Sequence, residues 1–151
     1  MAKKTKGVQY YEGVGRRKKA VARVRLYLAA KQAEVTVNNH KIKAGEIYIN
    51  NHPAVNFFSL AWEQQTYLLP LKLTNNEGRF AVSILVHGGG RAGQLEAVSH
   101  GISRALNLVD KDTFRPVLKE HGLLTRDPRK KERRKVGTGG KARRAKQSPK
   151  R

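Results

Sequence analysis

The stretch RFAVSILVHGGGRAGQLEAVSHGISRALNL, residues 79–108, decides the fold of this chain. Its apolar beginning predicts a buried strand over Arg79–Val86, which ends at the glycines of 88–90. A helix is predicted to follow from about Arg91 to Leu108, because apolar side chains recur on one stripe at helical spacing. These side chains are Leu95, Val98, Ile102, Ala105 and Val109. A second face of the helix is built of small residues that allow close approach to a sheet: Ala97, Gly101 and Ala105.

The chain before this stretch is predicted to supply the rest of a sheet. Residues 8–28 have strand character with an interruption at Gly13–Gly15, and their second half alternates apolar residues with arginines. Alternation with a period of two is typical of a strand with one buried face. The segments 34–37 and 41–43 flank the turn-rich sequence Asn38–His40, which favours a hairpin.

Short helices are predicted between this hairpin and the long helical stretch. Pro53 can open a helix within residues 44–66, and Phe58 and Trp62 then fall at helical spacing. Pro70 breaks the apolar run that follows. One or two short helices are therefore expected here.

A further helix is predicted to begin near Asp112 or Thr113 and to run to about His121. The carboxylate of Asp110 or Asp112 can cap it, and Pro116 is tolerated only in the first turn. The order of elements is strands, short helices, a strand and two helices. This order predicts an α+β fold, with one sheet and helices on one of its faces.

Charge divides the chain into a folding unit and two basic ends. The net charge is +21, to which residues 126–151 contribute +11, residues 1–25 contribute +8 and residues 26–125 only +2. The last 26 residues contain one large apolar side chain, so burial cannot offset the entropy of ordering them. We predict a flexible N-terminus over 1–7, a globular domain over 8–125 and a tail over 126–151 that is disordered when free.

This charge predicts association with an anionic surface, either nucleic acid or membrane. No apolar run approaches the roughly 20 residues that span a bilayer, and the tail lacks the apolar stripe of an interfacial helix. No hydrophobic segment follows the first lysines, as it would in a secretory signal. The absence of cysteine excludes disulfides, Cys-based zinc sites and thiol nucleophiles. Nucleic acid is the expected partner, without a membrane.

The glycine-rich segment 88–93 admits several interpretations. It matches the dinucleotide fingerprint G-x-G-x-x-G, but the acidic residue that should end a second parallel strand caps a helix instead. The segment 87–90 mimics an esterase oxyanion motif, yet no G-x-S-x-G elbow follows. Two interpretations stay open. The segment is a phosphate site at a helix N-terminus, with Arg91 adding charge, or its glycines serve tight turning and packing, and the two interpretations are compatible.

Other basic residues are candidates for phosphate contacts. Arg16–Lys19 place four successive cations beside a strand, which favours a phosphate clamp over a solvated edge. His100 and Arg104 lie four residues apart on one helix face, where they contact phosphates or face solvent. The five histidines show no metal-ligand spacing, so no metal is predicted. No cofactor is predicted either.

Three segments together resemble the ninth small-subunit ribosomal protein family, bacterial type. GVGRRKKAVARV at 13–24 is similar to its opening signature. Similar to its central helix motif are GGGRAGQ at 88–94, Ala97, His100–Ile102 and Arg104–Leu106. Similar to its tail are LLTRDPR at 123–129, ERRK at 132–135, KAR at 141–143 and the terminal Lys150–Arg151. The resemblance runs in order from about Val8 to the C-terminus.

Two departures from the family pattern stand out. The chain ends Gln147–Ser148–Pro149–Lys150–Arg151, whereas the family usually ends Gln-Phe-Ser-Lys-Arg, so the aromatic near the tip is absent. Residues 48–73 match the family only loosely, which leaves the helices predicted there without its support.

The resemblance implies a fold like the second domain of ribosomal protein S-five, a four-stranded sheet with helices on one face. It implies a non-enzymatic place in the subunit head, on the 3′ major domain of the rRNA and beside other head proteins. It also implies that the tail threads through rRNA and that its tip meets the anticodon stem-loop of P-site tRNA. No cofactor or small-molecule substrate is implied. The expected location is the cytoplasmic ribosome, with an organellar ribosome also open.

The predicted interface combines these motifs with the basic tail. Candidate rRNA contacts are Arg16, Arg17, Lys18, Lys19, Arg23, Arg91, Gln94, His100, Arg104, Arg126, Arg129, Lys130, Arg133, Arg134, Lys135, Lys141, Arg143, Arg144 and Lys146. Candidate tRNA contacts are Ser148, Lys150 and Arg151. A DNA-packaging protein of the nucleoid is the alternative, because charge alone does not separate it from an rRNA-binding protein.

Overall fold

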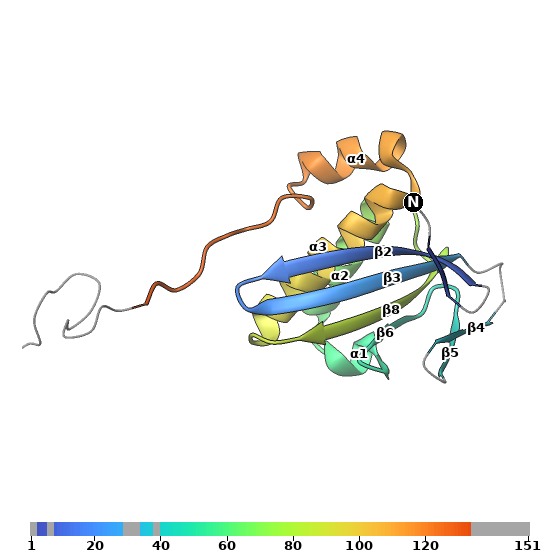
Figure 1. Ribbon diagram of the computed structural model, residues 1–151, viewed down its shortest axis with the longest axis horizontal. Helices are drawn as coiled ribbons and strands as arrows, with labels where there is room; N and C mark the ends of the chain where they lie inside the picture. The colour runs from blue at the N-terminus through green and yellow to red at the C-terminus, as the bar shows by residue number, and fades with distance from the viewer. Residues whose placement is uncertain (1–2, 6–7, 29–33, 38–39, 134–151) are drawn as a thin grey trace, which may run out of the picture.

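The computed structural model describes residues 3–5, 8–28, 34–37 and 40–133, and Figure 1 shows a sheet with helices packed against it. Within these residues the main sheet has the strand order β1-β2-β3-β8-β6-β7. Neighbouring strands run antiparallel, except that β6 lies parallel to β8. The strands are β1 (Lys3–Thr5), β2 (Val8–Arg17), β3 (Ala20–Leu28), β6 (Ile47–Ile49), β7 (His52–Pro53) and β8 (Phe80–His87).

Helices and a separate two-stranded ribbon complete the described chain. Helix α3 lies across β2 and β3, and α2 packs beside α3 (Figure 1). The helices are α1 (Ala54–Phe57), α2 (Ala61–Leu73), α3 (Arg91–Val109) and α4 (Lys111–Glu120), and the ribbon pairs β4 (Glu34–Val37) with β5 (His40–Lys43). The predicted α+β class, hairpin and long helix are confirmed. Asn38 and Asn39 of the predicted turn lie outside the described residues.

The main sheet is larger than the four strands expected from the family resemblance, because the described chain adds two short edge strands. These are β1, with three residues, and β7, with two. The sequence pattern also predicts only helices in residues 44–66, where β6 and β7 lie. Strands this short show no readable alternation, so their pairing with neighbours is what identifies them.

Gly13 and Gly15 lie inside β2, where the sequence pattern predicts an interruption of the strand. The strand continues instead and turns only at Lys18–Lys19. A Cβ on Gly15 would lie 1.9 Å from the carbonyl oxygen of Ala97. One on Gly13 would lie 2.4 Å from the carbonyl oxygen of Gly101. The glycines are required because α3 packs directly on the backbone of β2, which leaves no room for a side chain.

Two hydrophobic clusters lie on opposite faces of the sheet. The larger lies between the sheet and the helices, and β3 contributes the predicted alternating residues Ala20, Ala22, Val24 and Leu26. The smaller is formed by the other face and the β4–β5 ribbon, with Tyr10, Tyr27, Val35, Val37, Ile42 and Ala81. Arg23 also lies on that second face, and it is exposed.

The short helices differ from the prediction in where α1 ends and in the position of Pro70. Helix α1 begins directly after Pro53, as predicted, but it ends at Phe57, so Phe58 and Trp62 do not share one helix. Pro70 lies inside α2 instead of breaking it. Pro70 is buried, as are Tyr67 and Leu71 of the same helix, so burial offsets the hydrogen bond that proline cannot make.

Helix α4 begins slightly earlier than predicted. Its cap is Asp110, whose carboxylate accepts the backbone N–H groups of Asp112 and Thr113, both at 3.1 Å. The helix therefore starts at Lys111, and Pro116 falls just beyond its first turn. The cap itself was one of the two carboxylates that the sequence singles out.

Candidate nucleic-acid interface

A two-residue turn brings two lysines to one end of the sheet. Lys18 and Lys19 join β2 to β3, and both side chains are exposed. Lys18 has a φ of +51°, in the left-handed region that a tight turn uses. Two of the four cations predicted at 16–19 therefore project from a well-defined hairpin.

The glycine-rich loop after β8 packs against this turn. Gly88 and Gly89 have φ values of +72° and +66°, and a Cβ on Gly88 would lie 2.5 Å from the carbonyl oxygen of Lys19. Gln94 reaches back from α3, and its side-chain amide donates to the Gly88 carbonyl oxygen at 3.1 Å. The packing interpretation of these glycines therefore holds.

A hollow of about 480 Å³ lies where the turn, the loop and the chain after α4 meet. It is lined by Lys18, Lys19, Gly89, Gly90, Arg91, Ala92, Gly93, Lys130 and Lys131. Helix α3 begins here without a side-chain cap, so its first backbone N–H groups are available to a ligand. Among the described residues, none of the four lysines has an ion-pair partner. Four ammonium groups and the positive end of a helix dipole can hold phosphate groups.

Arg91, predicted to add charge to this loop, binds a carboxylate of the same domain. Its guanidinium donates to Glu63 of α2 from Nε to Oε1 at 2.6 Å and from Nη2 to Oε2 at 2.7 Å. Glu63 is buried and also accepts the backbone N–H of Leu60 at the start of α2. The hydrogen bonds from Arg91 lower the pKa of the Glu63 carboxyl. The pair is therefore ionised at neutral pH, and Arg91 links α3 to α2.

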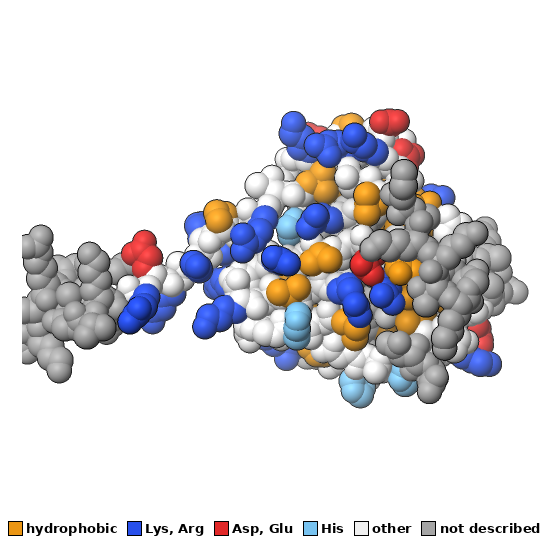
Figure 2. Space-filling view, viewed as in Figure 1, with side chains coloured by type: hydrophobic (Ala, Val, Ile, Leu, Met, Phe, Trp, Pro, Cys, Tyr) orange, Lys and Arg blue, Asp and Glu red, His pale blue; other side chains and the backbone are white. Residues whose placement is uncertain are grey.

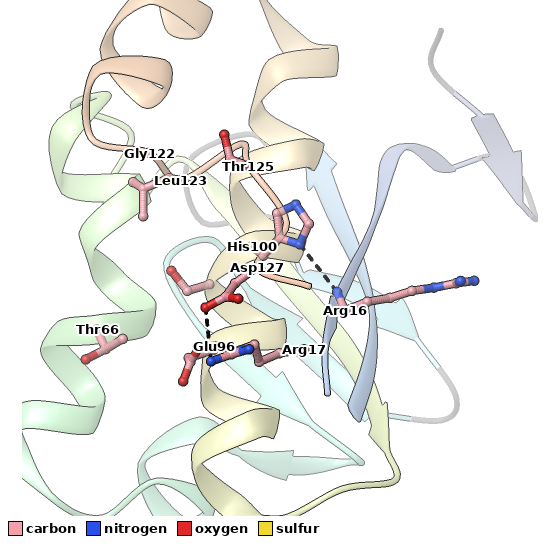
Figure 3. Close-up of a pocket in the computed structure, with 10 residues that line it drawn as sticks. Arg16, Arg17, Thr66, Glu96, His100, Gly122, Leu123, Thr125 and Asp127 are labelled. Atoms are coloured by element: carbon pink, nitrogen blue, oxygen red, sulfur yellow. Dashed lines mark hydrogen bonds and ion pairs between the residues drawn. The ribbon is translucent and has the colours of Figure 1, made fainter. Parts of the chain in front are cut away.

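Arg17 also differs from its basic neighbours, because its side chain is nearly buried and binds the root of the tail. In Figure 3 it reaches toward Glu96 and Asp127, whereas the side chain of Arg16 points away from them. Nε donates to Glu96 Oε2 at 2.5 Å, and Nη2 lies 3.1 Å from Asp127 Oδ2. Nη1 donates to the carbonyl oxygen of Arg129 at 2.8 Å. We call Arg17, Glu96, Asp127 and Arg129 the tail latch.

Asp127 is the acidic centre of the tail latch. Its carboxylate accepts Nε and Nη2 of Arg129, the latter at 2.6 Å, and also the backbone N–H of Arg129 at 2.9 Å. The side-chain hydrogen bonds from Arg129, more than any other contact, lower the pKa of Asp127 to about 2. The carboxylate is charged at neutral pH, so the latch holds the point at which the chain leaves the domain (Figure 1).

His100 and Arg104 both bind the backbone of β2. His100 Nδ1 accepts the backbone N–H of Arg16 at 3.4 Å, and burial lowers the pKa of this imidazole, which is neutral at pH 7. Arg104 Nη1 donates to the Val14 carbonyl oxygen at 2.6 Å, although the residue is exposed. Both side chains thus tie α3 to the sheet, and their contact with phosphate stays a prediction.

The remaining predicted contacts are either exposed or outside the described residues. Exposed ones are Arg16, Arg23, Arg126, Arg129, Lys130 and Arg133. Lys131 lines the hollow and is a candidate that the sequence motifs did not single out, although it stands in the cation run 129–131. Outside the described residues lie Arg134, Lys135, Lys141, Arg143, Arg144, Lys146, Ser148, Lys150 and Arg151.

Fold and site define a basic α+β protein with a cationic surface. Figure 2 shows Lys and Arg side chains gathered over α4 and along the chain that leads out of the domain. In the described part of the chain, no cluster of acidic and histidine side chains could hold a metal ion. No helix there has the length and apolar character needed to cross a membrane.

Comparison with known proteins identifies the family. A family model described as ribosomal protein S9/S16 matches residues 15–151. The small ribosomal subunit protein uS9 of Solidesulfovibrio magneticus is 45% identical over 132 residues, which cover 87% of this chain and 90% of that protein. The chain belongs to the ribosomal protein S9/S16 family, whose members are structural, non-enzymatic proteins of the small ribosomal subunit. The resemblance seen in the sequence motifs is confirmed.

Proposed function

We propose that this chain binds rRNA of the small-subunit head, in the 3′ major domain, through a surface that we call the lysine face. It comprises Lys18, Lys19, Lys130 and Lys131 around the glycine loop. The observation that carries the proposal is the hollow at the start of α3. There, lysines from two distant segments surround backbone N–H groups that no side chain caps.

Such a surface recognises phosphates and not base edges. Lysine ammonium groups act as point charges on phosphate oxygens, and the helix N-terminus adds N–H donors. Neither reads a sequence, so the folded shape of the rRNA would select the binding position. Arg16 and Arg23 are exposed on the strands that flank the turn and extend the charged surface beyond the hollow.

A second part of the proposal concerns the tail. The tail latch supports it, because the latch fixes the point from which the basic tail extends away from the domain. Residues 126–151 comprise 26 residues, which reach roughly 85 Å when extended. We propose that this segment passes through rRNA and that Ser148, Lys150 and Arg151 contact phosphates of the P-site tRNA anticodon stem-loop. Phosphate contacts suit a site that must accept every tRNA.

We also propose that the fold is that of the second domain of ribosomal protein S-five. Support comes from the four longer or central strands, β2, β3, β8 and β6, with α3 packed on β2, β3 and β8 and α2 packed beside α3. Strands β1 and β7 would then be additions at the two edges. Because fold alone does not determine chemistry, the RNA-binding proposal does not depend on this assignment.

Binding to isolated 3′-domain rRNA at several salt concentrations tests the lysine face. We expect the logarithm of the association constant to fall linearly with the logarithm of salt concentration, by about 0.7–0.9 per neutralised phosphate. A slope near zero would exclude phosphate recognition. Duplex DNA of equal length is the control, and equal affinity for it would favour the DNA-packaging alternative.

Deletion of Lys150 and Arg151 tests the tail separately. We expect subunits to assemble with the shortened chain but to retain P-site tRNA less well, because two cations are lost from the tip. The measurement is tRNA dissociation from purified subunits at low and high magnesium. Unchanged dissociation in both conditions would exclude the tRNA contact and leave rRNA binding untouched.

A further inference from the structure

A long segment of this strongly basic chain contains no Lys or Arg. It runs from Ala44 to Leu71, between Lys43 and Lys72, and Glu46 and Glu63 are its acidic residues. The segment forms β6, β7, α1 and most of α2. We call the outer surface of its two helices the α1–α2 face.

Large apolar side chains are exposed on the α1–α2 face. They are Val55, Leu60, Trp62 and Leu69. Trp62, the one tryptophan of the chain, is 55% exposed. Along α2, Trp62, Gln65, Leu69 and Lys72 are spaced by three or four residues, so they form one stripe on the side of the helix that faces away from the core, with the lysine at its C-terminal end.

A hollow of about 380 Å³ lies beside this stripe, between β6, α1 and α2. Its walls include Gln64 and Leu68, and Glu46 lies at its edge. Arg91 reaches the start of α2 from the neighbouring helix, but its charge is matched by the buried carboxylate of Glu63. The α1–α2 face is therefore largely apolar, and the charged side chains beside it, Lys72 at the end of α2 and Glu46 at the hollow, are of opposite sign.

We propose that the α1–α2 face binds another protein of the small subunit, through a segment that combines apolar side chains with Lys or Arg. RNA is disfavoured, because phosphates would find Lys72 at one end of the stripe but no Lys or Arg between Ala44 and Leu71, and would meet Glu46. Exposed tryptophan and leucine beside glutamines match a protein interface, where tryptophan is enriched at positions of strong binding. Oε2 of Glu46 accepts the backbone N–H of Lys43 at 3.0 Å, and the charge of this carboxylate is complementary to a basic partner.

This proposal goes beyond rRNA binding because it concerns a different surface and a different class of partner. Photo-cross-linking within assembled small subunits tests it. The variant Trp62→p-benzoylphenylalanine places a reactive group on the exposed stripe without changing a buried residue. We expect a link to another subunit protein, at a peptide that contains both apolar and basic residues. The matched control is Lys130→p-benzoylphenylalanine, which we expect to react with rRNA.

Several outcomes would overturn this interface. They are a link from position 62 to rRNA, to a second copy of this chain or to an acidic peptide, and no link at all while position 130 reacts with rRNA. A protein link from position 62 without an RNA link from position 130 would support the interface and contradict rRNA binding by the lysine face. The experiment can therefore contradict rRNA binding by the lysine face while it supports the α1–α2 interface, or the reverse.

A charge variant gives a second measurement. We expect Trp62→Glu to keep its affinity for isolated 3′-domain rRNA within about twofold, and to be retained about tenfold less well in subunits washed with salt. Thr113→Glu adds the same charge at an exposed position of α4 and is the control. Equal retention of the two variants would contradict the proposal.

Discussion

The lysine face and the α1–α2 face are two surfaces of one small domain, and helix α3 supports both. Its N-terminus lies at the lysine face, and its side packs against α2, which carries the other face. Four lysines belong to the first surface, whereas the second has Lys72 at its end and no Lys or Arg over Ala44–Leu71. The net charge of +21 is thus not a uniform property of the protein, and each surface suits a different partner.

The two cation types are also used differently around α3. Arg17, Arg91 and Arg104 bind groups of the domain itself, with two of them held by carboxylates. The lysines of the hollow have no such partner among the described residues. The guanidinium fork binds carboxylates and carbonyls with fixed geometry, so these arginines hold the elements together. The lysines remain available to an external anion.

The largest effect on stability is expected when the packing of α3, which supports both faces, is disrupted. In Gly15→Ala the new Cβ would lie 1.9 Å from the carbonyl oxygen of Ala97, so α3 must move away from β2. We expect a loss of about 3 kcal/mol or more in the free energy of unfolding, measured with urea, and loss of both surfaces.

Gly90→Ala is the matched control for the glycine variant. A Cβ on Gly90 would meet no atom within 4 Å, and its backbone is extended. We expect a change of about 1 kcal/mol or less in either direction. If both glycine variants unfold at the same urea concentration, close packing of α3 on β2 is not what the glycine in β2 provides.

The second-largest effect is expected from charge reversal on the lysine face, which should weaken RNA binding. For Lys18→Glu with Lys19→Glu we expect the affinity for 3′-domain rRNA to fall on the order of 100-fold at low salt, and the salt slope to decrease by about 2. The fold should persist, because both side chains are exposed in the turn. Lys111→Glu with Lys119→Glu makes the same change in charge on α4. An equal loss in that control would mean that net charge, and not the hollow, determines binding.

The class of the fold and its long helices and strands can be predicted from the sequence. Its short or interrupted helices and strands cannot. The stripe of Leu95, Val98 and Ile102 predicts α3, because a 19-residue helix repeats its pattern several times. Strand β7 has two residues and repeats nothing. The local preference of Pro70 is to end a helix, but this residue lies buried inside α2, and only the tertiary fold creates that burial.

The local sequence also does not predict whether a given Lys or Arg binds a group of the domain itself or remains available to phosphate. The sequence identifies Arg17 and Arg91 as candidate phosphate ligands, but their carboxylate partners lie 79 and 28 residues away, at Glu96 and Glu63. Residue type and spacing predict a charge, whereas the fold decides whether that charge is satisfied within the domain. Lys18 and Lys19 remain exposed because they project from a two-residue turn at the end of the sheet.

Acid should release the tail latch, because the carboxylate of Asp127 at its centre becomes protonated. The folded pKa of Asp127 is about 2, below its ordinary value of 3.8. The stabilisation from this carboxylate is therefore present above about pH 4 and is lost as the pH falls toward 2. A spin label on Lys130→Cys, in a chain without native cysteine, should become more mobile over that range.

Asp127→Asn should show the mobile signal already at neutral pH, because the amide cannot replace the charge that binds Arg17 and Arg129. Circular dichroism in parallel separates release of the latch from unfolding of the domain. Asp112→Asn, at an exposed position of α4, is the control. A label equally immobile in Asp127→Asn and in the parent chain would mean that the latch does not hold the tail root.

The smallest effect is expected from Trp62→Ala. Trp62 and Phe58 are both large aromatic residues at the start of the α2 region, but Trp62 is 55% exposed and Phe58 is fully buried in the core. Truncation of Phe58 should cost about 3–5 kcal/mol in unfolding free energy, whereas truncation of Trp62 should cost about 0.5 kcal/mol or less. Urea unfolding followed by circular dichroism measures both. The rRNA affinity of Trp62→Ala should match that of the parent chain, because the α1–α2 face does not contact phosphate. A large loss of stability would mean that Trp62 supports the fold, and its exposure would then no longer point to a partner.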